Sequence, residues 1–556
     1  MTEPDDRSAD SPPPGQQPGQ RYPHAGWDQP PLAEVPSGDG DWQWTPPGQA
    51  ADLPHGQYPG YLLPGYPAPT RPRRLRWVLS AAAAVLVLVL GGGAFAAYEV
   101  LNGGGEQPDQ VVPASAVAFT KLDLNPSAGQ KIAAARFLHR LPKVGSGFTG
   151  SRDWRESIFQ ALDGDGSLPA GVQYDRDVKP WLGKRLGVAA LPTLRDGKPE
   201  VLLALQSTDD AKARVGIRRF NAEAGIGFLH GYAVVAETQQ LADQAVADAK
   251  AASLAGSDTY RSDMRTLGGL GVASGWLDLG QLSKLAKQAG QDHLASGFGG
   301  LDTGRLAATV RLGGTSADLI GKLLGARPSG STAAPSLADL PGSTAVAMSA
   351  SIPPGTLDAY WNRISTAVGG FLVPNPAGDP SGSFSDPIQS LQDQFGITLP
   401  RDLDTLLGHG VSVAVDSNGI DRGMPHIAVR TVTDGKAAVR VLDKVRDAVQ
   451  QYGTDLPFSY REVPGGLLAG NDKGYLDQVA GAGGGLGGQG AFTKALPDLA
   501  GASMVGYVNF DAISGELAKG GGRADQRAAL SSFQAAGMTV RLENGITTLH
   551  VRLLAH

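Results

Sequence analysis

Two acidic residues stand at a spacing that could bind a metal ion. Asp163 and Asp165, in the stretch ALDGDGSLP, correspond to the first and third positions of a calcium-binding loop. Such a loop also needs glycine at its sixth position and glutamate at its twelfth, where this chain has Leu168 and Tyr174. We therefore interpret ALDGDGSLP as a turn and not as a metal site.

A second stretch, GAGGGLGGQG, contains Gly483, Gly485 and Gly488 in the G-x-G-x-x-G pattern of dinucleotide-binding folds. In those folds the pattern closes a strand and opens a helix. Here it follows YLDQVA, which has the pattern of a helix. The stretch is therefore predicted to be a flexible loop, and no cofactor is expected.

Nucleophilic and metal chemistry find little support elsewhere in the chain. It has no cysteine, which excludes disulfides, thiol catalysis and thiolate metal sites, and it lacks G-x-S-x-G, H-E-x-x-H and the phosphate-loop pattern. The histidines of the distal part do not pair at metal-ligand spacing. They are His139, His230, His293, His409, His426, His550 and His556. We assign no catalytic, cofactor-binding or metal-binding residue.

Two of these histidines can be placed from their neighbours. His550 alternates with apolar residues in LHVRLL, which predicts the outward face of a strand. His409 stands where the first copy of the repeat described below has Lys184, which indicates an exposed and tolerant position.

Three aspartates follow apolar strands, in KLDL, WLDL and NFDA: Asp123, Asp278 and Asp511. A carboxylate at the end of a strand can be catalytic. Helical stretches follow these positions, so we expect the three residues to cap the next helix or turn.

The elements that position these residues begin with a tail and an apolar segment. Residues 1–74 are rich in proline, lack apolar periodicity and are predicted to be a disordered cytoplasmic tail. Trp77 to Tyr98 are 22 residues without a charge, which as a helix would reach about 33 Å, enough to cross a bilayer. Four arginines precede this segment and Glu99 follows it, so the positive-inside rule places the C-terminal bulk outside the cytoplasm.

We therefore predict a transmembrane helix over residues 75–98, with residues 77–98 in the lipid bilayer, in a single-pass plasma-membrane protein. The alternative is a signal peptide cleaved after Ala96. About 70 residues precede the apolar segment, which is unusual for a signal peptide.

The distal part carries an internal repeat. TVRLGGTSADLIGKLLGA from Thr309 matches TVRLENGITTLHVRLLAH from Thr539, and PASAVAFTKLDLNPS from Pro113 matches PGSTAVAMSASIPPG from Pro341. Further matches in the same order join STDDAKARV to VTDGKAAV, and VASGWLDLG with Asp278 to MVGYVNFDA with Asp511. We predict two copies of one unit, residues 113–326 and 341–556, with linkers at 99–112 and 327–340.

Within one copy, strand-like and helix-like stretches alternate. The predicted strands are SAVAFTKLDL, LGVAALP, PEVLLALQS, GYAVVAE, GVASGWLDL and LAATVRLGG. The predicted helices are Ser127–Leu141, Asp153–Leu162, Asp209–Ala222, Thr238–Ala255 and Leu279–Lys287. Thr208-Asp209 and Thr433-Asp434 read as helix caps, and the closing hairpins turn at Gly-Gly and at Asn-Gly. Each copy is therefore expected to be α+β, with a mainly antiparallel sheet and helices on one face.

The stretch VKPWLGKRLGVAALP, with KLDLNPS upstream and GWLDL downstream, resembles the domain of unknown function 3352 family of actinobacterial membrane proteins. The likeness is carried by Pro113–Leu141, Val178–Thr208 and Val234–Leu279. It implies an exported, membrane-tethered domain and no particular activity. The second copy has LDTLLGHG in place of VKPWLGKR and so loses Trp181.

These patterns favour a membrane-anchored binding or scaffolding protein of the cell envelope, with an apolar ligand or an envelope protein as partner. The net charge of −6 and the pI near 5.9 argue against a nucleic-acid partner. Two alternatives stay open: an extracytoplasmic hydrolase with a non-sequential site, and a signalling adaptor read through its tail.

Overall fold

The computed structural model describes most of the chain beyond residue 105. The described residues are 106–123, 171–291, 303–325, 332–359, 392–451, 456–481, 485–519 and 530–556, with the short pieces 136–137, 153, 155–156, 159–160, 163, 168–169, 361 and 389. The tail predicted over 1–74 and the membrane helix predicted over 75–98 lie outside these residues. Within them, no helix has the length and apolar character needed to cross a membrane.

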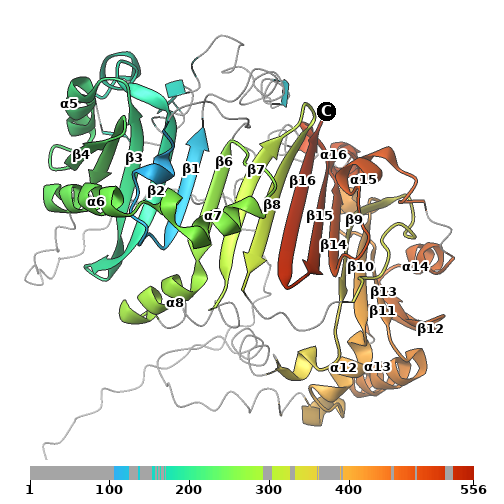
Figure 1. Cartoon of the computed structure of the whole chain (residues 1–556). Coiled ribbons are helices and arrows are strands. Elements are labelled where there is room, and N and C mark those ends of the chain that lie inside the picture. Colours follow the sequence, from blue (N-terminus) through green and yellow to red (C-terminus); the bar gives the residue numbers. More distant parts are fainter. Residues whose placement is uncertain are drawn as a thin grey trace, which may run out of the picture. The chain divides into compact units, whose positions relative to one another are not determined.

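A continuous sheet of 16 strands runs through the described residues (Figure 1). Its strands are β1 (Ala118–Asp123), β2 (Leu182–Arg195), β3 (Lys198–Ser207), β4 (Gly225–Leu229), β5 (Tyr232–Ala236), β6 (Ala273–Asp278), β7 (Arg305–Leu312), β8 (Ser316–Leu324), β9 (Thr344–Ser351), β10 (Gly410–Asp416), β11 (Ile427–Val432), β12 (Ser459–Val463), β13 (Gly466–Gly470), β14 (Met504–Asn509), β15 (Phe533–Glu543) and β16 (Ile546–Ala555). Neighbouring strands pair antiparallel. The predicted α+β class with a mainly antiparallel sheet is therefore confirmed.

Helices connect many of these strands. The α-helices of the described residues include α5 (Asp210–Phe220), α6 (Gln239–Ala251), α7 (Asp258–Arg265), α8 (Leu279–Gln288), α12 (Arg401–Leu407), α13 (Gly435–Gln450), α14 (Lys473–Ala480), α15 (Gly490–Ala495) and α16 (Phe510–Lys519). Short turns of helix are η1 (Pro108–Gln110), η2 (Tyr174–Val178, a π-turn), η3 (Leu254–Gly256) and η4 (Ile420–Arg422). Three predicted helices correspond to α5, α6 and α8. The helices predicted over 127–141 and 153–162 lie mostly outside the described residues.

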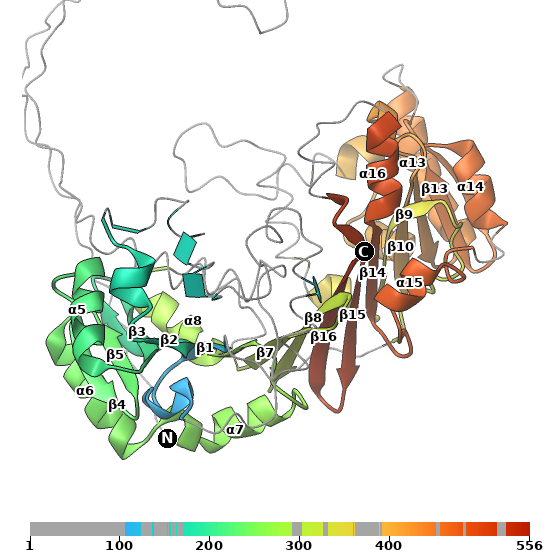
Figure 2. The same ribbon diagram turned by 90° about the horizontal axis from the view of Figure 1, so that it is seen from above.

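Helices cover both faces of the sheet, so the expectation of helices on one face is wrong. Tyr232 of β5 packs with Leu241 of α6. Ala233 and Val235 point to the opposite face and pack with Ile217 of α5. Figure 2 likewise shows α7 and α8 on opposite sides of the strands. GYAVVAE is buried on both faces. The sequence of such a strand has no alternating polar residues, so it does not show which face is covered by helices.

The strand order is the same in the two halves of the chain, which we call the first half (106–325) and the second half (332–556). Read outward from their junction, the first is β8-β7-β6-β1-β2-β3-β5-β4 and the second is β16-β15-β14-β9-β10-β11-β13-β12. At the junction Ile320 of β8 lies opposite His550 of β16. The match between the two TVRL segments aligns these same two residues. Equivalent positions therefore face each other, as in an interface with two-fold symmetry.

The predicted caps and the Asn-Gly turn are confirmed, whereas the turn between β7 and β8 has Gly314 and Thr315 at its tip because Gly313 pairs with Ser316. The Asp209 carboxylate accepts the amide N–H of Lys212 at 3.0 Å, and Asp434 accepts that of Ala437 at 3.0 Å. Asn544 and Gly545, with φ of 52° and 75°, make the two-residue turn between β15 and β16. Local chemistry is sufficient to specify these features.

Parts of the two expected linkers pack into the fold. Val111 and Val112 are fully buried in the main cluster of the first half, and the carbonyl of Val112 accepts the N–H of Leu254 at 2.8 Å. In the second half, Leu340 is buried and its carbonyl accepts the N–H of Leu486 at 3.0 Å. The folded part therefore begins before the predicted boundaries at 113 and 341.

The first half contains buried polar pairs. The Asp109 carboxylate accepts the Tyr260 hydroxyl at 2.9 Å and lies 3.3 Å from Nζ of Lys121. Asp263, 2 % exposed, accepts Nε1–H of Trp276 at 2.8 Å and Nε–H of Arg305 at 2.7 Å. The two carboxylates can be buried because each of them accepts hydrogen bonds from nearby side chains.

The second half has apolar residues at the equivalent places. Strand register and the hydrogen bonds between corresponding loops give the equivalent positions. They pair Asp109 with Leu337, Tyr260 with Phe492, Asp263 with Ala495, Trp276 with Tyr507, and Arg305 with Ala535. Phe492 and Tyr507 keep the edge-to-face ring contact that Tyr260 and Trp276 make. The Tyr507 hydroxyl is buried without a hydrogen-bond partner among the described residues, because Ala495 stands where the first half has Asp263.

Candidate functional site

The two motif stretches carry no site in the described part of the chain. Asp163 is an exposed helical residue where we expected a turn, and Asp165 lies outside the described residues. Gly485 and Gly488 lie in a loop after α14, as predicted, and Gly485 packs against Gly342. Gly483 is outside the described residues. No group of three or more His, Asp or Glu that could hold a metal ion occurs within the described ranges.

The three strand-end aspartates behave differently from one another. Asp278 caps α8 by accepting the N–H of Gln281 at 2.9 Å, as predicted. Asp123 is bound by Nε of Arg185 at 3.0 Å, and the residues after it lie outside the described part. Asp511 does not cap α16. Asn509 does so by accepting the N–H of Ala512 at 3.0 Å, so Asn509 has the role in the second half that Asp278 has in the first.

His550 lies in an ion-pair cluster at the junction of the halves. Its Nε2 is 2.7 Å from Oδ1 of Asp318, and Nε of Arg552 donates to the same oxygen at 2.6 Å. Burial opposes ionisation of Asp318, but these two partners outweigh it and lower the pKa of Asp318. Ser316 donates its hydroxyl to Asp318 and not to His550, so the described residues supply no nucleophile for this pair. His409 is exposed, as predicted.

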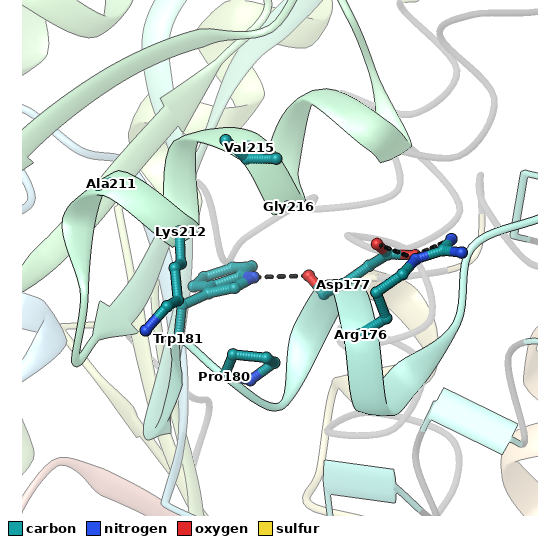
Figure 3. Close-up of a pocket in the computed structure, with 8 residues that line it drawn as sticks. All are labelled: Arg176, Asp177, Pro180, Trp181, Ala211, Lys212, Val215 and Gly216. Carbon is teal, nitrogen blue, oxygen red and sulfur yellow. Dashed lines mark hydrogen bonds and ion pairs between the residues drawn. The ribbon is translucent and has the colours of Figure 1, made fainter.

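A hollow lies beside Trp181, where α5 packs against η2 (Figure 3). It encloses about 400 Å³ and is lined by Arg176, Asp177, Pro180, Trp181, Ala211, Lys212, Val215 and Gly216. Val215 is an apolar side chain that is 62 % exposed, whereas Trp181 is 3 % exposed. The lining is thus an apolar floor with charged side chains at its rim.

Trp181 is fixed from two sides. Its Nε1–H donates to the carbonyl of Asp177 at 2.7 Å, across the last turn of η2. Gly216 of α5 lies against the indole, and a β-carbon at Gly216 would overlap Nε1 of Trp181 and the Asp177 carbonyl. Glycine is required here because the helix backbone approaches the ring directly.

Asp177 is a buried carboxylate whose charge is fully partnered. Arg176 donates Nε–H and Nη2–H to it at 2.8 and 2.7 Å, and the amide N–H of Gln173 donates at 2.9 Å. Nε of Arg219, on α5, lies 3.4 Å away. The hydrogen bonds from Arg176 lower the pKa of Asp177 to about 2, so the carboxylate stays ionised and is not a general acid or base.

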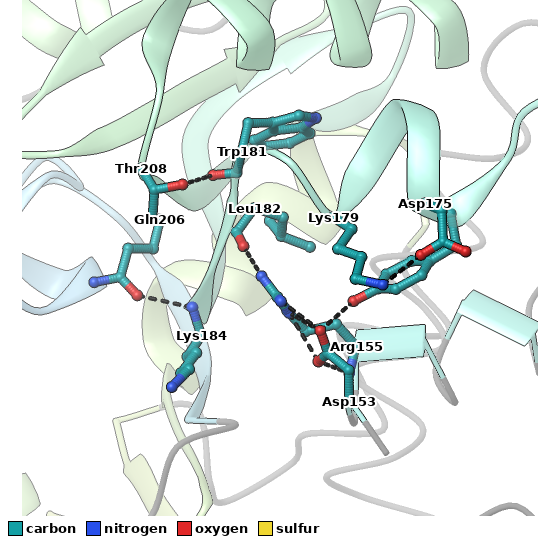
Figure 4. A network of polar contacts seen from close by, with 10 residues as sticks. Asp153, Arg155, Asp175, Lys179, Trp181, Leu182, Lys184, Gln206 and Thr208 are labelled. Atoms are coloured by element: carbon teal, nitrogen blue, oxygen red, sulfur yellow. Dashed lines mark hydrogen bonds and ion pairs between the residues drawn. The ribbon is translucent and has the colours of Figure 1, made fainter. Parts of the chain in front are cut away.

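A polar network supports the other side of Trp181 (Figure 4). Arg155 donates to the carbonyl of Leu182 and to Asp153, and the Tyr174 hydroxyl donates to Asp153 at 2.6 Å. Burial opposes ionisation of Asp153, but the hydrogen bonds from Arg155 and Tyr174 prevail and lower its pKa to about 2. This network ties the segment before β2 to the base of the hollow.

The second half fills the same place with different side chains. The register that matches Asp209 with Asp434 matches Trp181 with Leu406 and Gly216 with Val441. Leu406 packs against Ala438 and Leu442, as Trp181 packs with Ala213 and Ile217. The first half thus has a large and a small residue where the second half has two of medium size, and the strand order is the same in both.

A family described as "Protein of unknown function (DUF3352)" matches residues 79–229. The match covers every residue that lines the hollow and supports the resemblance drawn from the sequence. Part of that likeness, Val234–Leu279, lies beyond the matched range. No curated protein and no solved structure matches the chain.

Proposed function

We propose that the protein is a single-pass plasma-membrane protein whose distal part binds an apolar or amphipathic ligand, or an envelope protein, outside the cytoplasm. Residues 77–98 would span the bilayer and residues 1–74 would be cytoplasmic. The distal part would be a duplication of one α+β unit. The hollow beside Trp181 carries the proposal of binding.

The shape and chemistry of the hollow favour binding over catalysis. Its volume is within the range of small-molecule sites, and its floor is apolar. The titratable groups at its edge are held in ion pairs: Asp177 with Arg176 and Lys212 with Asp209. The Asp177 carboxylate, which Arg176 keeps ionised, can orient a ligand but does not transfer protons.

Strand register supports the proposed duplication. The matched segments that start at Pro113 and Pro341 align Phe119 with Ala347, and a second match aligns Ala189 with Ala414. In the sheet Phe119 lies opposite Ala189, and Ala347 lies opposite Ala414. A shift of one residue in either alignment would break this agreement.

Binding at the hollow can be tested on the full chain purified in detergent. Native mass spectrometry is expected to detect a lipid, small molecule or peptide that co-purifies with the protein. Val215→Asp should remove this species, because a carboxylate then stands in the apolar part of the lining. The matched variant Arg440→Asp, at the equivalent position of α13, should retain it.

Both substitutions are at exposed positions and should change stability by less than about 0.5 kcal/mol. A protein that carries no ligand, or a ligand that survives Val215→Asp unchanged, would contradict binding at this hollow.

A further inference from the structure

The end of the first half that carries the hollow is also the end where the described chain begins. The carbonyl of Glu106 accepts the hydroxyl of Tyr232 at 2.9 Å. Tyr232 begins β5 opposite Gln206, near the end of β3. Thr208, just after β3, donates its N–H to the carbonyl of Trp181 at 2.8 Å. Glu106 and the hollow therefore lie at the same end of the strands.

A short segment joins this end to the proposed membrane span. Residues 99–105 are seven residues, which extend at most about 25 Å. β2 alone has 14 residues and is about 45 Å long. This inference rests on the proposed function, in which residues 77–98 span the bilayer. The distance from Glu106 to the bilayer is then shorter than the length of one strand.

The two segments that form the hollow carry a net positive charge in an otherwise acidic protein. Residues 174–184 and 209–219 carry seven lysines and arginines and four aspartates, whereas the whole chain has a net charge of −6. Five exposed cations lie on or directly beside η2 and α5, and two of them, Arg176 and Lys212, line the hollow. The five are Arg176, Lys179, Lys212, Arg218 and Arg219. Of the four aspartates in these segments, Asp177 is buried, Asp209 is half-buried, and Asp175 and Asp210 are exposed.

The second half supplies a matched comparison. The equivalent residues 399–409 and 434–444 carry four lysines and arginines and four aspartates, and so have no net charge. β8 and β16 occupy equivalent positions and pair antiparallel, so the two halves run in opposite directions. The neutral end therefore lies at the opposite end of the strands from the charged one.

We propose that α5 and η2 rest on the outer surface of the membrane from which the chain emerges, and that their cations bind anionic phospholipid headgroups around the exposed Val215. Each cation near an anionic membrane strengthens binding by about fivefold. The short tether makes the contact intramolecular, so weak individual attractions are sufficient. A free acidic peptide has the same charge but lacks the tether, which is why lipid is the favoured partner.

The absence of native cysteine allows a direct test. Val215→Cys and Arg440→Cys are made separately in the full chain, spin-labelled, and reconstituted in nanodiscs of phosphatidylcholine alone or with phosphatidylglycerol. Collision with a water-soluble nickel relaxation agent is expected to fall severalfold at position 215 in the anionic discs. Position 440 should be equally accessible in both discs. Adding Lys212→Glu and Arg218→Glu should restore access at position 215.

Extraction with alkaline carbonate distinguishes failure of the lipid contact from failure of the membrane anchor. If the chain stays in the disc and position 215 is equally accessible in both lipids, the proposal is overturned and the anchor stands. If carbonate releases the chain, the anchor and the proposal both fail. Protection of position 215 by an acidic peptide on zwitterionic discs, without protection by anionic lipid, would assign the surface to a peptide and overturn the lipid proposal.

Discussion

Asp263→Ala is expected to lower the free energy of unfolding of the first half by about 3 kcal/mol. The substitution leaves the guanidinium of Arg305 and the indole N–H of Trp276 without their buried acceptor. Arg305 keeps 30 % of its side chain exposed, which holds the cost to the lower part of the range for broken buried pairs. Urea unfolding of the full chain, with hydrogen exchange at the amides of β6 and β7, measures the loss locally.

The second half provides the control for this prediction. Asp263→Ala with Arg305→Ala reproduces its residues Ala495 and Ala535, and removes both charges together. This double variant should recover most of the stability lost in Asp263→Ala, because no unpaired charge is left. Equal destabilisation by the single and double variants would contradict this prediction. It would show that the stability comes from the ion pair itself and that the unpaired charge of Arg305 adds no cost.

Gly216→Val is expected to destabilise the first half by about 1–3 kcal/mol and to disrupt the hollow. The new side chain would overlap Trp181 and the Asp177 carbonyl, so α5 must move away from η2. Trp181→Leu alone should also destabilise, by about 2 kcal/mol, because it leaves a cavity under α5. Thermal unfolding of each variant measures these losses.

The pair Trp181→Leu with Gly216→Val reproduces Leu406 and Val441 of the second half. The double variant should be more stable than either single variant, because the volume removed from the indole is returned by the valine. Additive losses would show that the two halves do not share this packing. The double variant would also lack Trp181, so ligand binding at the hollow should remain lost while the fold is restored.

Features set by neighbours in the sequence could be predicted. Asp209 and Asp434 cap helices because a short acceptor before an amphipathic stretch satisfies its first N–H groups. Asn544-Gly545 sets a hairpin because both residues accept positive φ. The prediction that Asp511 caps a helix was wrong. Asn509, two residues earlier, is an equally good cap and is the last residue of β14.

Features set by distant contacts could not be predicted. The sequence singled out Trp181 as a difference between the copies, but the hollow depends on α5, η2 and Gly216 meeting across about 40 residues. The Asp318–His550–Arg552 cluster joins residues more than 200 positions apart. Helices on both faces were missed because strands such as GYAVVAE are apolar on both sides.

The accessibility of single cysteines in intact, wall-stripped cells tests the anchored arrangement most directly. Met424→Cys places a thiol at a side chain that is 73 % exposed in the second half, and Ser37→Cys places one in the tail, in a chain with no other cysteine. With a membrane-impermeant maleimide, Met424→Cys should react without lysis and Ser37→Cys only after lysis. The reverse pattern, or reaction of both variants in unlysed cells, would contradict a tail inside and a binding module outside.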